Sequence, residues 1–89
     1  MNDLNVIEVL TSDISAAAHG CLDRYPGVMH PEQLKCDIAL RILDEGLGRD
    51  LLDHEYPGER IWWIQGIGYR IIREHLAEFE QHREANDAR

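Results

Sequence analysis

Histidine and cysteine side chains in the first half of the chain are the first candidates for chemistry. His19, Cys21, His30 and Cys36 could together supply the four ligands of a zinc site. Their spacing contains neither a CxxC pair nor an HExxH pair, and residues two apart on a helix point in different directions. The sequence therefore predicts no metal site and no cofactor.

The serines and cysteines are the candidate nucleophiles. Catalysis by such a group needs a base and an orienting residue beside it. Ser12, Ser15 and the two cysteines lie in no recognisable elbow or cysteine-protease context. The segment 65–68 (QGIG) precedes no Lys-Ser/Thr pair, so it matches neither a P-loop nor a dinucleotide fingerprint. We therefore expect that the chain is not an enzyme.

Acidic residues are densest in segment 44–55, where Arg49 is the only base. The carboxylates are those of Asp44, Glu45, Asp50, Asp53 and Glu55. Their order does not follow the calcium loop of an EF-hand. They are compatible with a solvated helix end and loop, or with a docking surface for Lys and Arg side chains of a partner.

Two adjacent tryptophans are the most informative residues for binding. On a helix, Trp62 and Trp63 point about 100° apart, so they cannot both face one core. Trp62 can shelter beside Tyr69, whereas Trp63 falls on the solvent side. Trp63 is then either covered by the 48–60 connection or available to a partner, at whose interface Trp is a frequent hot-spot residue.

Three amphipathic segments must position these residues. Apolar side chains recur at spacings of three and four over 3–22, 31–47 and 61–83, which predicts helices. Leu51 and Leu52 indicate a short capping turn, and Tyr56-Pro57-Gly58 indicates a turn before the third helix. We expect an all-α, small three-helix bundle in one domain (1–89), with the capping turn between helices 2 and 3 and a frayed tail over 84–89.

Gly66 and Gly68 leave two interpretations of the third segment open. Each glycine costs about 1 kcal/mol relative to Ala inside a helix. A hairpin with IWWI and YRII as strands is the alternative. The apolar spacing continues without interruption into residues 73–81, which favours a helix that either breaks locally or packs closely at Gly68.

Charge limits the kind of partner. The 89 residues carry 17 acids and 9 Lys or Arg, for a net charge of -8. Residues 1–55 hold eleven acids and four bases, and residues 56–89 hold six and five. Such a chain is poorly suited to phosphate backbones and well suited to a protein with a basic surface. It has no apolar run long enough to cross a membrane, and its N-terminus lacks a basic segment. We expect a cytoplasmic protein without direct nucleic-acid or membrane binding.

Together these patterns predict a small acidic protein-binding module that uses the acidic segment with Trp62, Trp63 and Tyr69. Its most specific form is a phage or mobile-element inhibitor, a DNA mimic that blocks the nucleic-acid-binding surface of a host defence complex. The alternative is a transcription-related helical regulator or dimerisation domain. A homodimer is a further expectation, because three helices cannot cover the broad apolar face of 31–47 and the additional aromatics.

Overall fold

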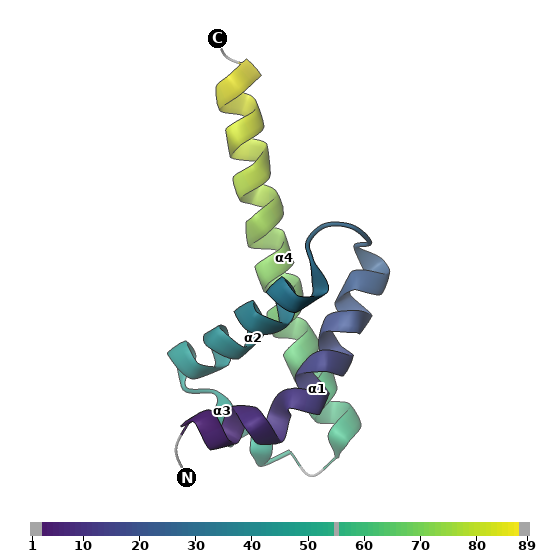
Figure 1. Ribbon diagram of the computed structural model, residues 1–89, viewed down its shortest axis with the longest axis vertical. Coiled ribbons are helices and arrows are strands. Elements are labelled where there is room, and N and C mark those ends of the chain that lie inside the picture. The colour runs from purple at the N-terminus through teal and green to yellow at the C-terminus, as the bar shows by residue number, and fades with distance from the viewer. Residues whose placement is uncertain (1–2, 55, 88–89) are drawn as a thin grey trace.

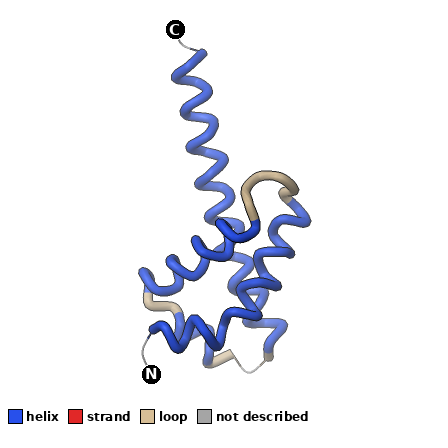
Figure 2. The backbone as a smooth tube through the Cα atoms, viewed as in Figure 1, coloured by secondary structure: helices blue, strands red, loops and turns tan. Residues whose placement is uncertain are grey.

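The architecture consists of three main helices and one short one. The computed structural model describes residues 3–54 and 56–87, and Figures 1 and 2 show helices joined by short loops, with no strand in this part of the chain. The helices are α1 (Asp3–Arg24), α2 (Pro31–Glu45), α3 (Gly48–Leu52) and α4 (Pro57–Asp87). The prediction of an all-α fold with a short capping helix before the last long helix is confirmed.

Local capping explains the bounds of α2. Pro31 occupies the first turn, where its missing N–H costs nothing, and the His30 ring accepts a hydrogen bond from the Glu32 N–H at 3.2 Å. Gly46 adopts a left-handed conformation (φ 65°) that ends the helix. The helix therefore ends at Glu45, two residues before the predicted boundary.

The start and the end of α4 correct the predicted bounds. Pro57, expected in a turn, begins the helix four residues before Ile61, and the Arg60 N–H donates to the Tyr56 carbonyl at 3.2 Å. The turn prediction was wrong because a proline suits a turn and a first helical position equally well. At the other end α4 continues through Asp87, so residues 84–87 are helical where a frayed tail was expected.

The two glycines of α4 do not interrupt the helix, so the hairpin interpretation was wrong. A Cβ at Gly68 would lie 2.8 Å from the Cys21 sulfur and 3.4 Å from Cδ1 of Ile38. Gly68 thus allows α4 to approach both α1 and α2. Gly66 points outward, and no described atom lies within 4 Å of its Cβ position.

The core lies where α1, α2 and α4 meet. Its fully buried side chains are mainly aliphatic: Leu10, Leu34, Ile38, Ile42, Ile64, Ile72 and Cys21. Asp13 is the buried charged residue of the described part, and its carboxylate accepts from Arg60 Nε at 2.7 Å. This ion pair joins α1 to the start of α4.

The second half of α4 projects beyond the bundle (Figure 1), in a molecule of 52 × 25 × 17 Å. The core-facing stripe of α4 continues along this projection. Ile71 and Ile72 are buried, but His75 is exposed and Phe79 is 64% exposed. The stripe of α4 that faces the core therefore continues beyond the part of the helix that the bundle buries.

The two cysteines have opposite environments. Both are free thiols; Cys21 is buried and Cys36 is exposed. Burial raises the pKa of the Cys21 thiol from 9.0 to about 11. The thiol of an unfolded chain ionises at the lower pH. The neutral Cys21 thiol therefore contributes stability that is fully present below pH 9 and is lost as the pH rises toward 11.

We expect a thiol reagent at pH 8 to modify Cys36 quickly and to leave Cys21 unmodified in the folded protein, because the thiolate is the reactive form. Mass spectrometry of the labelled peptides measures this, with urea-unfolded protein as the control in which both react. Equal rates at the two thiols in the folded protein would contradict the buried position of Cys21.

Candidate protein-binding site

The described carboxylates of the predicted acidic segment line three different hollows. Asp44 lines a groove between α2 and α4, whereas Glu45 and Asp50 line a separate hollow beside Trp63. Asp53 belongs to a third hollow, against α1. Glu55 lies outside the described residues. Carboxylates that are close in sequence thus line different hollows, because α2 ends at Glu45 and the chain changes direction after it.

The hollow beside Trp63 measures about 440 Å³. The His54 ring stacks on the Trp63 indole at 5.8 Å between centroids, with 21° between the planes. The Glu45 carboxylate lies 3.7 Å from the Arg70 guanidinium. The 48–60 connection thus covers one face of Trp63, and one of the predicted acids already has a cation from its own chain.

Both tryptophans remain accessible. Trp62 is 66% exposed and Trp63 is 49% exposed, and their rings meet edge to face at 5.7 Å. The expected shelter of Trp62 beside Tyr69 was wrong. The Tyr69 ring instead packs against Tyr25 at 6.1 Å, with the Arg24 guanidinium 5.9 Å from its centroid. Trp62 and Tyr69 line one hollow together, but Tyr69 packs against the end of α1 and leaves Trp62 exposed.

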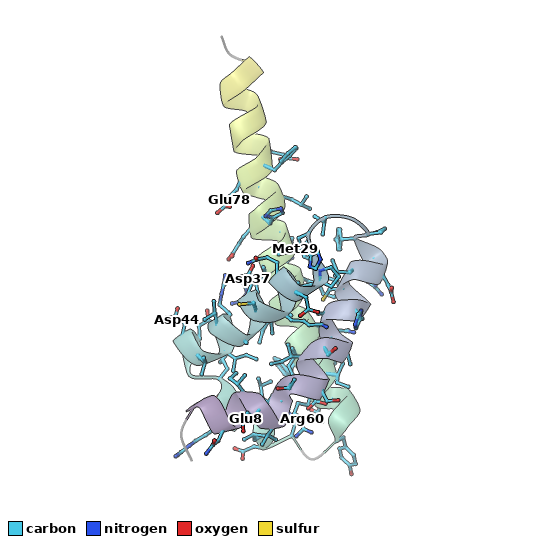
Figure 3. All side chains as sticks on the ribbon, in the orientation of Figure 1. Glu8, Met29, Asp37, Asp44, Arg60 and Glu78 are labelled. Carbon is cyan, nitrogen blue, oxygen red and sulfur yellow. The ribbon has the colours of Figure 1, made fainter. Side chains whose placement is uncertain are left out.

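A groove between α2 and the projecting half of α4 was not predicted. We call it the acidic groove; its volume is about 610 Å³. Its apolar residues are Met29, Leu40, Leu43 and Ile71, and its charged or titratable residues are Asp37, Arg41, Asp44, Glu74, His75 and Glu78. Figure 3 labels Met29 beside α2, Asp37 and Asp44 along α2, and Glu78 on the projection. Four carboxylates and four apolar side chains thus line one groove.

Internal contacts organise the acidic groove. Arg41 donates to both Glu74 oxygens, at 2.7 and 3.4 Å, and this hydrogen bonding lowers the pKa of the Glu74 carboxyl. Asp37 accepts from the Gln33 amide at 2.8 Å. Leu40 is 57% exposed at the groove. With Arg41 held by Glu74, the groove presents an excess of negative charge beside accessible apolar surface.

Over residues 5–54, 56 and 58–80, no three His, Cys, Asp or Glu side chains come together as ligands for a metal ion. None of the helices, over their described lengths, has the run of apolar residues needed to cross a bilayer. The groups at the candidate site include carboxylates, aromatic rings and aliphatic side chains, the types that contribute charge and apolar contact at protein interfaces.

Sequence reasoning missed the acidic groove because its two walls are far apart in the chain. Asp37, Arg41 and Asp44 form the narrow polar strip of α2, which is visible as a pattern. Glu78 joins them only because α4 crosses α2 and continues past it.

No family model, curated protein or solved structure matches this chain.

Proposed function

We propose that this chain is a non-catalytic, acidic protein-binding module whose partner presents a basic amphipathic helix to the acidic groove. The observation that carries the proposal is the combination of four carboxylates with four apolar side chains in one groove. Amphipathic helices bind such grooves through apolar anchors on one face. Lys and Arg beside those anchors would reach the carboxylates at the rim.

The chemistry of the groove defines the partner class. Leu40 and Met29 offer contact to aliphatic side chains, while Asp44 and Glu78 flank them with negative charge. Lys and Arg that bind carboxylates are also the residues that hold phosphates. A partner captured here would lose access to nucleic acid, which supports the inhibitor form of the proposal.

Charge reversal in the groove tests the proposal directly. We expect a labelled amphipathic helical peptide of Leu and Lys to bind, with an affinity that falls as salt rises. The variant Asp44→Lys/Glu78→Lys should weaken binding at least about tenfold, because it replaces attraction by repulsion at the rim. Fluorescence anisotropy measures the affinity, and a matched Leu–Glu peptide should not bind.

The control for this test is Glu8→Lys/Asp23→Lys. It makes the same change in net charge on exposed positions of α1, outside the groove. An equal loss of affinity in both variants would show that the effect comes from the net charge of the molecule. The groove would then not be the binding site. Release of duplex DNA from the Leu–Lys peptide on adding the chain would support the inhibitor form.

A second candidate function, a dimerisation domain of a helical regulator, is favoured by the exposed tryptophans of α4. They line a hollow with Gly66 and Tyr69 that is separate from the acidic groove. A surface with two accessible indoles is typical of an interface.

A further inference from the structure

The side of α4 that points away from the core has an unusual composition, and we call it the outer face. Gly66 lies at its centre. Glu59, Trp62 and Trp63 precede it, and Tyr69, Arg70 and Arg73 follow it. Spacings of three, four and seven keep all of them on one side of the helix. The outer face is therefore aromatic and charged, with a gap where a side chain would normally stand.

The fold of a single copy does not explain Gly66. Glycine in a helix interior costs about 1 kcal/mol relative to Ala. Gly68 is needed for packing against Cys21, but at Gly66 no described atom lies within 4 Å of the Cβ position. Three hollows of about 440, 260 and 240 Å³ all include Gly66 in their lining. The absent side chain leaves the helix backbone open to close approach from outside.

The charges and rings of the outer face are complementary to themselves about Gly66. In an antiparallel pair with a two-fold axis at this residue, a position on one edge of the face meets a position at about the same distance beyond Gly66 on the same edge. Glu59 of one copy then meets Arg73 of the other. Trp62 meets Tyr69, which allows an aromatic contact, and Trp63 meets Arg70, which allows a cation–π contact. Each of these pairs occurs twice in a two-fold dimer.

We infer that a second copy of this chain docks on the outer face, with the two α4 helices antiparallel and crossing at Gly66. Gly66 lets the helices approach, the four indoles of the dimer are covered, and each Arg73 finds a carboxylate. The inference rests on the second candidate function and deepens it, and it uses a different surface from the acidic groove. The acidic groove remains open in the dimer, so the two can fail independently.

The substitution Gly66→Glu tests the crossing point. It places two carboxylates at the axis of the dimer, whereas in a single copy it meets open space and improves helix propensity. We expect dimerisation, measured by sedimentation velocity over micromolar to millimolar concentrations, to weaken at least about tenfold. His19→Glu is the control, because it adds a carboxylate to the exposed side of α1 and should leave dimerisation unchanged.

Exchange of the charged pair tests the register. Arg73→Glu should weaken the dimer, and Glu59→Arg/Arg73→Glu should restore it to within about threefold of the original, because the pair re-forms in the opposite sense. Glu59 also lies 3.4 Å from its own His54, so Glu59→Arg alone is measured as well. If either residue acted only on the structure of the monomer, the double variant would not recover dimerisation.

Three results would overturn the inference. They are a wild-type chain that stays monomeric at millimolar concentration, a Gly66→Glu variant that dimerises like wild type, and a charge exchange that fails to restore the dimer. Circular dichroism confirms that each variant is folded. Binding of the Leu–Lys peptide by Gly66→Glu should match wild type, which separates this interface from the acidic groove.

Discussion

Replacing Gly68 with valine is expected to lower the free energy of unfolding by about 3 kcal/mol, because overpacking a filled core forces neighbours to shift. Even a Cβ at this position would lie 2.8 Å from the Cys21 sulfur and 3.4 Å from Ile38. Neither neighbour can move easily, since both side chains are fully buried. Urea unfolding followed by circular dichroism at 222 nm measures the change.

The chain supplies a matched control two residues away. Gly66→Val makes the same chemical change in the same helix, but its Cβ position is open. It should leave the free energy of unfolding of the monomer equal or slightly higher. Cys21→Ala in the Gly68→Val background should recover part of the loss by removing the sulfur. Equal stability of the two valine variants would contradict the close approach of α4 to α1.

Loss of the Arg60 side chain is expected to lower the free energy of unfolding by about 2 kcal/mol. Arg60→Leu leaves the Asp13 side chain, which is 12% exposed, without the guanidinium that donates to its carboxylate at 2.7 Å. Removing one partner of a buried pair is costly because the other charge stays desolvated; the partial exposure of this pair reduces the cost. Urea unfolding again measures the effect.

Two further variants test whether this loss of stability comes from the unpaired Asp13 carboxylate. Asp13→Leu/Arg60→Leu should be more stable than Arg60→Leu alone, because no unpaired charge remains. Arg41→Leu breaks a pair of the same length, Arg41–Glu74 at 2.7 Å, whose carboxylate is half exposed. It should cost less than about 1 kcal/mol. If Arg60→Leu costs no more than Arg41→Leu, the contact between α1 and the start of α4 contributes little.

The two proposed surfaces lie on different sides of α4. On one side, the projecting half of α4 forms a wall of the acidic groove with Glu74 and Glu78. On the other, the outer face carries Trp62, Trp63 and Gly66. A dimer through the outer face would present two acidic grooves, and a bivalent partner would then bind with higher avidity than a single groove allows.

The sequence by itself determined the helices of this protein. Apolar spacing of three and four requires a helical period, and Pro31 with Gly46 defines the bounds of α2 through backbone chemistry that acts within a few residues. The adjacency of Trp62 and Trp63 also required that one ring leave the core. These conclusions depend on local geometry, which a sequence carries directly.

The tertiary structure decided which neighbour each face meets. Gly66 and Gly68 are the same residue in the same helix, yet they point about 200° apart, one outward and one against Cys21. Periodicity assigns an angle about the helix axis, but the crossing of α4 over α1 and α2 determines what occupies that angle. For the same reason the described carboxylates of segment 44–54 line three different hollows, and Asp44 shares a groove with Glu78 instead of with Asp53.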